Sequence, residues 1–189
     1  MSKRIAILAS GAGTNAENIV RHFQSGKKAT VALILCNNPK AGVLRRAEKF
    51  SVPYVVFNKQ TFYETDVIET RLKELRIDLI VLAGFLWLLP AKFVEAFQGK
   101  IINIHPALLP KYGGKGFYGM KVHQAVLKNG DKKSGITIHY VNEEFDDGRI
   151  IAQFECDVNE DDTPETLAAK ISRLEYKYYP EFIERLLEK

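Results

Sequence analysis

The strongest constraint on the fold is a regular alternation between short β-type apolar runs and segments with helical periodicity. The apolar runs that predict strands cover residues 5–9, 31–35, 54–57, 79–83 and 101–104. The first three are followed by helical patterns, one of them across residues 41–50. Strands that alternate with helices form parallel sheets covered by helices on both faces. The sequence therefore predicts an α/β fold with a mostly parallel, twisted sheet.

Two of the predicted helices have capping signals at their N-termini. Thr61 and Glu64 have the spacing of a capping box, which predicts that a helix begins there. Thr163 followed by Pro164 predicts the start of a long final helix, which Pro180 is expected to kink or break. The residues expected to face the core are Val67, Ile68, Leu72 and Leu75 in the first helix and Leu167, Ile171, Leu174 and Tyr178 in the final one.

The last two predicted strands differ from the others because a turn, and no helix, connects them. Residues 134–141 alternate between apolar and polar side chains, and residues 149–158 form the next strand-like run. The turn over residues 142–148 predicts an antiparallel hairpin, which we place at one edge of the sheet. No repeat, low-complexity tract or linker interrupts the chain. We therefore expect residues 1–189 to form one domain.

The composition places the chain among soluble globular proteins. Hydrophobic residues make up 46% and charged residues 26% of the chain, which excludes a disordered protein. The formal net charge of +4 suits small phosphates or carboxylates but is too weak to indicate a nucleic-acid partner. Residues 79–89 are too short a run for a membrane span, and the N-terminal run is too short for a signal peptide. With only Cys36 and Cys156, which predict no disulfide, the protein is expected in the cytoplasm.

A glycine loop separates the first strand from the first helix. It reads Ser10-Gly-Ala-Gly-Thr-Asn15, and the free amides of a helix start favour a phosphate. Gly11-x-Gly13-x-x-Ala16 also fits a dinucleotide fingerprint. That fingerprint needs an acid after the second strand, and residues 36–40 contain none, which argues against a nicotinamide cofactor. A glycine loop that serves only a tight turn is the remaining alternative.

Asn103 and His105 stand at the end of the fifth strand. Two residues apart on a strand, they point to the same side, towards the crevice where open α/β sheets bind ligands. A carboxamide and an imidazole could act together there on one substrate atom, although a purely structural histidine is the alternative. The other histidines, His22, His123 and His139, are scattered, and no Cys/His pair has ligand spacing, which argues against a metal site.

Two further loops are expected near this crevice. Residues 84–90 stay apolar after the fourth strand, so they should either pack in the core or line a pocket for a flat apolar ligand. Residues 111–119 are rich in glycine and predict a surface loop that closes over the site. On their local patterns alone, Asp146 and Glu175 are expected to be solvated charges, and His123 is expected to face solvent.

A resemblance adds to this interpretation. Residues 103–110, Asn-Ile-His-Pro-Ala-Leu-Leu-Pro, resemble the signature Asn-x-His-Pro-Ser-Leu-Leu-Pro of folate-dependent formyltransferases, with Ala107 in place of serine. With the glycine loop, Ala83-Gly-Phe85 and the Asp-Gly turn, nearly the whole chain resembles the phosphoribosylglycinamide formyltransferase family. The resemblance implies a Rossmann-like formyltransferase fold. It also implies formyl transfer from 10-formyltetrahydrofolate to the amine of glycinamide ribonucleotide, a step of purine biosynthesis, with no metal.

The resemblance also implies roles for individual residues. The catalytic set would be Asn103, His105 and Asp146, with His139 supporting the catalytic histidine. The residues implied to bind the ribonucleotide are Gly13, Thr14, Asn15 and Glu175. The residues implied to contact the folate are Lys59, Leu86, Trp87, Leu88, Leu89, Asn103, Asn142, Glu143, Glu144, Phe145 and Asp146.

Two departures from the family pattern affect these roles. Trp87 stands where family members often have arginine, so the folate pocket should be more apolar here. The loop at residues 113–118 is longer than usual, although Gly119-x-x-x-His123 restores the common spacing. Hydrolysis of formyltetrahydrofolate and a nucleotide-sensing module without catalysis are the competing functions. The expected partners are small molecules only, and the chain could act as a monomer or a homodimer.

Overall fold

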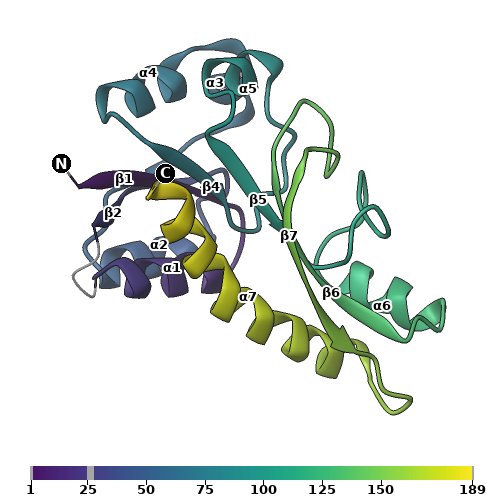
Figure 1. Cartoon of the computed structure of the whole chain (residues 1–189). Coiled ribbons are helices and arrows are strands. Elements are labelled where there is room, and N and C mark those ends of the chain that lie inside the picture. The colour runs from purple at the N-terminus through teal and green to yellow at the C-terminus, as the bar shows by residue number, and fades with distance from the viewer. Residues whose placement is uncertain (1, 25–27, 189) are drawn as a thin grey trace.

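A seven-stranded sheet forms the centre of the molecule in the computed structural model, which describes residues 2–24 and 28–188 (Figure 1). The strands are β1 (Lys3–Ala9), β2 (Ala29–Cys36), β3 (Tyr54–Val56), β4 (Leu79–Leu82), β5 (Ile101–His105), β6 (Lys133–Tyr140) and β7 (Ile150–Asp157). Their order across the sheet is β3-β2-β1-β4-β5-β6-β7. The first five strands are parallel, whereas β6 and β7 each run antiparallel to their neighbours. The predicted mostly parallel sheet with an antiparallel hairpin at one edge is confirmed.

Helices cover both faces of the sheet. They are α1 (Thr14–Gln24), α2 (Gly42–Lys49), α3 (Lys59–Glu64), α4 (Val67–Glu74), α5 (Ala91–Ala96), α6 (Met120–Lys128) and α7 (Pro164–Leu187). The group α3, α4 and α5 packs on one face, and α1, α2 and α7 lie on the other (Figure 1). Side chains of β1 alternate between the two cores, with Ile5 and Ile7 in one and Ala6 and Leu8 in the other. This burial on both faces explains why the strand is apolar without interruption.

The predicted capping box at Thr61 is wrong. Helix α3 begins two residues earlier, because the side-chain oxygen of Asn58 accepts a hydrogen bond of 2.8 Å from the Thr61 N–H and caps the helix. The helix ends at Glu64, and α4 begins separately at Val67. Val67 is 58% exposed, contrary to the expectation that it faces the core, whereas Ile68 and Leu72 are buried as expected.

The predicted cap of the final helix is confirmed, but Pro180 does not break the helix. A proline removes the N–H that would bond to the carbonyl of Tyr176, four residues earlier. That carbonyl accepts a hydrogen bond of 2.7 Å from the Asn18 side chain on α1 instead, so α7 continues to Leu187. Tyr179 and Ile183 in this part of α7 are fully buried, whereas Tyr178 is only partly buried.

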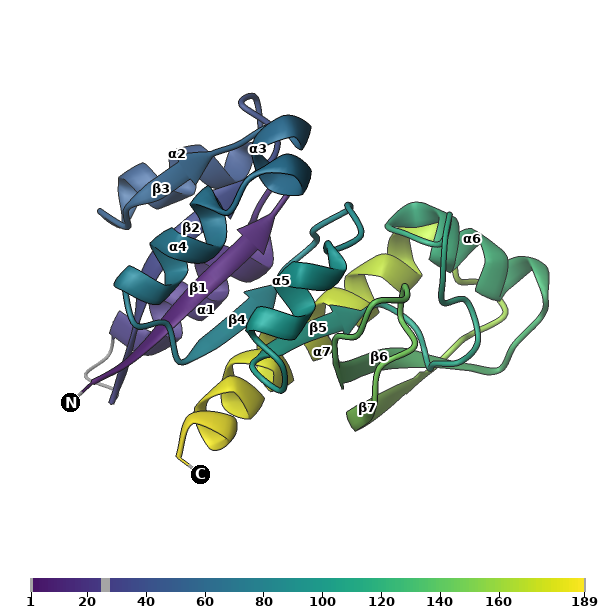
Figure 2. The same cartoon turned by 90° about the horizontal axis from the view of Figure 1, so that it is seen from above.

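The strand order reverses between β1 and β4, which are neighbours in the sheet although β2 and β3 separate them in the chain. Connections from these two strands leave in opposite directions, and this arrangement opens a crevice beyond the carboxyl ends of the strands. Two hydrogen bonds tie the loops there, from the Ser10 N–H to the Gly84 carbonyl (3.0 Å) and from the Leu86 N–H to the Ser10 hydroxyl oxygen (3.0 Å). Figure 2 shows the β6–β7 hairpin and α6 at the opposite end of the sheet from β3.

Candidate functional site

A cavity of about 650 Å³ lies at the carboxyl ends of β4 and β5. Its wall combines apolar side chains of the loop after β4 with polar side chains from β5, α1, α7 and the β6–β7 loop. A volume of this size suits a ligand of cofactor dimensions, and convergent polar groups in a mostly apolar wall are typical of binding sites. The cavity therefore defines the candidate active site.

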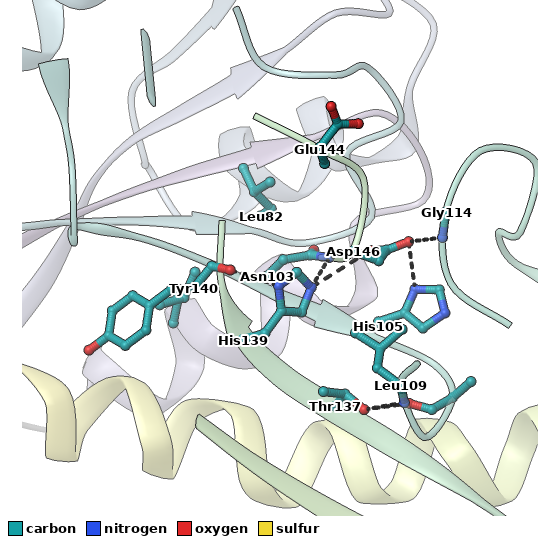
Figure 3. A network of polar contacts seen from close by, with 12 residues as sticks. Leu82, Asn103, His105, Leu109, Gly114, Thr137, His139, Tyr140, Glu144 and Asp146 are labelled. Carbon is teal, nitrogen blue, oxygen red and sulfur yellow. Dashed lines mark hydrogen bonds and ion pairs between the residues drawn. The ribbon is translucent and has the colours of Figure 1, made fainter. Parts of the chain in front are cut away.

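Asn103, His105 and Asp146 meet at the wall of this cavity (Figure 3). The Asn103 side-chain amide donates to one Asp146 carboxylate oxygen at 3.3 Å, and the His105 Nδ1 lies 3.4 Å from the other. His139 joins the network because β5 and β6 pair with Asn103 opposite His139, where the Asn103 amide lies 3.1 Å from its Nε2. The four residues predicted from the family pattern are thus in one network.

The hydrogen bonds determine where the ring protons lie. The His139 Nδ1 is 2.8 Å from the Tyr140 carbonyl, and since a carbonyl only accepts, this nitrogen donates. The Nε2 of a neutral His139 ring is then free to accept from Asn103. The His105 Nε2 likewise donates to the Tyr112 carbonyl at 2.7 Å, while its Nδ1 faces Asp146. A His105 ring that carries a proton on each nitrogen can donate to both of these acceptors, the Tyr112 carbonyl and the Asp146 carboxylate.

Asp146 is ionised in this network. Burial by itself would raise its pKa, but the neighbouring His105 ring and the hydrogen bond from the Gly114 N–H outweigh burial and hold the pKa of Asp146 well below its usual value. Its backbone has a φ of 55°, a left-handed conformation that aspartate tolerates better than most residues. Gly148 allows the same loop to pack directly on the Tyr140 carbonyl, where a Cβ atom would overlap. The turn is therefore shaped to present this carboxylate.

The chain segment after His105 is held by Thr137 on β6. The Thr137 hydroxyl donates to the Ala107 carbonyl at 2.7 Å. It also accepts from the Leu109 N–H at 3.0 Å (Figure 3). Thr137 itself is buried. These bonds fix the direction in which the chain leaves β5 and so fix the position of His105. The strand alternation of residues 134–141 places Thr137 on the same face as His139, which is the sequence signal for this supporting role.

The glycine-rich loop (residues 111–119) lies against the network. Its Tyr112 carbonyl accepts from His105, and its Gly114 N–H donates to Asp146 at 3.0 Å. The Tyr112 hydroxyl donates to Asp131 at 2.8 Å, beyond the end of α6, which anchors one end of the loop. The loop therefore occupies the place expected of a lid over the site.

Asn15 and Glu175 form the polar side of the cavity. The Asn15 amide at the start of α1 donates to the Glu175 carboxylate on α7 at 3.0 Å, and both side chains line the cavity. Burial raises the pKa of Glu175, and the Asn15 hydrogen bond and the charge of His105 oppose this effect. Glu175 is therefore no solvated surface charge, contrary to its local pattern. Gly13 and Thr14 lie beside Asn15 but outside the cavity wall.

The loop after β4 forms the apolar side. Leu86, Trp87, Leu88 and Leu89 all line the cavity. The Trp87 ring also packs on Phe57 and Phe62, with ring centroids 5.9 Å and 6.1 Å apart. This loop therefore covers the core and lines the pocket, so both interpretations of its apolar sequence are correct.

The remaining residues expected near the folate divide into two groups. Asn142, Glu144 and Phe145 lie on the cavity wall with Asp146. Glu143 is exposed and does not line the cavity. Lys59 lies outside the wall, where its Nζ is 5.9 Å from the Trp87 ring centroid. The structure brings the first group to the site but does not bring Glu143 and Lys59 into it.

The expectation that His123 faces solvent is wrong. This side chain is 5% exposed and lines the cavity from α6. Its Nδ1 has no hydrogen-bond partner among the described residues, and burial together with the charge of His105 lowers the pKa of His123. The available signal was its spacing from Val126, since residues three apart share a helix face and Val126 is buried.

Within residues 2–24 and 28–188, no group of three or more His, Cys, Asp or Glu side chains could hold a metal ion. In the same ranges, no helix is long and apolar enough to cross a membrane.

The chain is similar to proteins of one family over most of its length. The profile of the formyl transferase family matches residues 3–183. Phosphoribosylglycinamide formyltransferase from Bacillus subtilis is 41% identical over 192 residues, which cover 98% of this chain and 95% of the relative. The chloroplastic phosphoribosylglycinamide formyltransferase from Arabidopsis thaliana is also 41% identical over 192 residues. There the alignment covers 98% of this chain but 66% of the relative, so this chain spans just under two thirds of the plant protein.

Solved structures of the same name share the fold. The crystal structure of phosphoribosylglycinamide formyltransferase from Bacillus halodurans has a TM-score of 0.89 at 39% identity, covering 99% of this chain and 96% of the other. The structure from Anaplasma phagocytophilum has a TM-score of 0.90 at 34% identity, covering 100% of this chain and 88% of the other. The chain therefore belongs to the formyl transferase family, among the phosphoribosylglycinamide formyltransferases.

Proposed function

We propose that the protein transfers the formyl group of 10-formyltetrahydrofolate to the amine of glycinamide ribonucleotide. The products are formylglycinamide ribonucleotide and tetrahydrofolate, in de novo purine biosynthesis. The observation that carries the proposal is the Asn103, His105 and Asp146 network on the wall of a cavity with one polar and one apolar side. Family membership supports the same reaction.

The two sides of the cavity suit the two substrates. Asn15 and Glu175 would hold the ribonucleotide, with its phosphate at Gly13 and Thr14 and its amine near Glu175. The free amides at the start of α1 favour an anion there. The apolar loop of residues 86–89 would hold the pterin of the folate, and Asn142, Glu144 and Phe145 would contact the same ligand.

The chemistry needs no covalent enzyme intermediate. The amine attacks the formyl carbon, the carbonyl oxygen becomes an oxyanion, and the bond from carbon to the folate nitrogen then breaks. Asn103 and protonated His105 would stabilise the oxyanion, and removing one such donor typically costs about 10²–10³ in turnover. Asp146 would stabilise the charged ring and assist proton movement from the attacking amine to the leaving nitrogen.

The hydrogen bonds in the structure add one step to this mechanism. The His105 Nε2 donates to the Tyr112 carbonyl, and the Asn103 amide donates to His139 and Asp146. For His105 to donate to an oxyanion, its Nε2 must exchange the Tyr112 carbonyl for the substrate oxygen. The glycine-rich loop would therefore shift when both substrates bind.

One assay separates this proposal from its competitors. Purified protein is incubated with formylated folate, with and without glycinamide ribonucleotide. Formylated ribonucleotide that appears only when both are present supports transfer. Formate release without the ribonucleotide would indicate a hydrolase, and the absence of any reaction would favour a binding module. The cytoplasmic location, the single domain, the choice between monomer and homodimer, and the restriction to small-molecule partners without a metal stay predictions.

A further inference from the structure

Helix α2 binds the glycine loop through two consecutive carbonyl groups. The Val43 N–H donates to the Gly11 carbonyl at 3.1 Å, and the Arg46 Nε donates to the Ala12 carbonyl at 2.7 Å. One donor is a backbone amide in the first turn of α2, and the other is a charged side chain one turn later. Both carbonyl groups therefore point towards α2.

The planar geometry of the peptide group determines where the N–H groups of Ala12 and Gly13 point. In a trans peptide the C=O and the following N–H point in opposite directions. If the Gly11 and Ala12 carbonyl groups face α2, the N–H groups of Ala12 and Gly13 face away from it. No acceptor for either N–H is recorded within the described part of the chain. Two adjacent amides on one side of a turn form a concave site for an anion.

Arg46 is itself held in place by Glu17 on α1. The two side chains form an ion pair, with 32% of the Arg46 and 14% of the Glu17 side chain exposed. The Glu17 N–H donates to the Gly13 carbonyl at 2.9 Å, which closes the first turn of α1. Arg46 thus connects the glycine loop to both helices that flank it. A guanidinium suits this position because it can donate in two directions from one rigid plane.

Close packing restricts the loop further. Gly13 has a φ of 75°, and a Cβ atom on it would lie 2.5 Å from the Val43 side chain. The loop therefore cannot move closer to α2. Its two hydrogen bonds to α2 determine its orientation.

We propose that Arg46 is a positioning residue that orients the Ala12 and Gly13 amides towards the phosphate of the ribonucleotide. This inference rests on the proposed function, which places the phosphate at the glycine loop. Arg46 does not touch the substrate in this arrangement. Its loss should weaken phosphate binding without affecting the formyl transfer step.

The test compares three variants by steady-state kinetics. Arg46→Gln should raise the KM for glycinamide ribonucleotide about tenfold, with kcat and the KM for the folate within about twofold of wild type. Arg46→Lys keeps a cation beside Glu17 but lacks the planar guanidinium group that can also donate to Ala12. It should therefore preserve the melting temperature and still raise the KM for the ribonucleotide. Lys49→Gln is the matched control, because Lys49 also faces Glu17, at 3.8 Å, without bonding to Ala12. It should leave the KM unchanged.

Two kinetic results would overturn the inference: an unchanged ribonucleotide KM in Arg46→Gln, or an equal rise in Lys49→Gln. A direct binding measurement separates this failure from failure of the proposed function. Calorimetric titration with ribose 5-phosphate should show about tenfold weaker binding to Arg46→Gln than to wild type, whether or not formyl transfer is detected. Equal affinities, or no binding to wild type, would contradict the role of Arg46.

Discussion

Asp146 is the residue on which the polar network converges. Its carboxylate lies beside His105 and accepts from the Asn103 amide and the Gly114 N–H, so three chain segments meet at one side chain. Its surroundings more than offset the effect of burial on its pKa. A buried carboxylate that stays ionised beside a histidine is typical of acid–base sites.

Replacing Asp146 by asparagine should lower kcat by about 10²-fold or more. Because the pKa of Asp146 is lowered in the wild type, its carboxylate stays ionised even at a pH below the usual aspartate pKa of about 4. Protonation of Asp146 should therefore not limit activity near neutral pH. Without the carboxylate, the His105 Nδ1 loses the partner that lies 3.4 Å away, so the loss of kcat should persist across the pH–rate profile. Wild-type rates for Asp146→Asn across the whole profile would show that the pairing has no catalytic role.

Glu175 should make ribonucleotide binding sensitive to acid. Since burial raises the pKa of Glu175, its charge is lost at a higher pH than that of an exposed glutamate. The KM of the wild type should therefore rise as the pH falls from 7 towards about 5. Glu175→Gln should have a KM about tenfold higher at pH 7, and the ratio of the two KM values should shrink as the pH falls. Protonation of the substrate amine affects both proteins equally, so a constant ratio would argue against this role.

The glycine-rich loop contacts two of the candidate catalytic residues, His105 and Asp146. Tyr112 contacts His105 and Gly114 contacts Asp146, while Gly116 follows with a similar backbone conformation. The φ angles of Gly114 and Gly116 are 87° and 97°, values that residues other than glycine rarely adopt. Both glycines therefore shape the loop, but among the described residues Gly114 bonds to the network and Gly116 does not.

Gly114→Ala should lower kcat several-fold more than Gly116→Ala does. Each substitution adds a Cβ atom at a left-handed position, at a cost of roughly 1–2 kcal/mol in local strain. Neither Cβ would meet a neighbouring atom within 4 Å. The difference between the two variants should thus report the hydrogen bond to Asp146. Steady-state kinetics and melting temperatures provide the measurement, and equal kcat values would mean that the loop contact is not used in catalysis.

At the scale of the whole molecule, the long helix α7 supports the sheet beneath the site. The buried Tyr179 hydroxyl donates to the Leu82 carbonyl at 2.9 Å, at the end of β4. The same helix supplies Glu175 to the cavity wall. One helix therefore fixes the end of a central strand and places a side chain in the active site.

Tyr179→Phe should lower the free energy of unfolding by about 1–2 kcal/mol, because the buried Leu82 carbonyl loses a donor. Tyr178→Phe is the control on the same helix. Its ring stacks on Phe154 with centroids 3.6 Å apart, and phenylalanine retains that contact. We expect its unfolding free energy to change by less than about 0.5 kcal/mol. Urea denaturation measures both, and equal losses would show that the Tyr179 hydrogen bond adds no stability.

Much of this protein was predictable from local sequence alone. The period of the apolar residues determined the strands and most helices, and the two-residue spacing of Asn103 and His105 placed both on one side of β5. Thr163 and Pro164 set the start of α7, as predicted. These features depend on interactions within a few residues, so the linear sequence contains their cause.

Other features were decided only by tertiary structure. Asp146 lies 43 positions after Asn103 in the chain, and only the pairing of β5 with the β6–β7 hairpin brings them together. Glu175 and His123 have polar side chains on helix faces whose burial depends on what packs against them. Pro180 is tolerated because a side chain of a distant helix satisfies the carbonyl that it leaves free. Local periodicity specifies elements, whereas non-local register and burial determine which side chains meet.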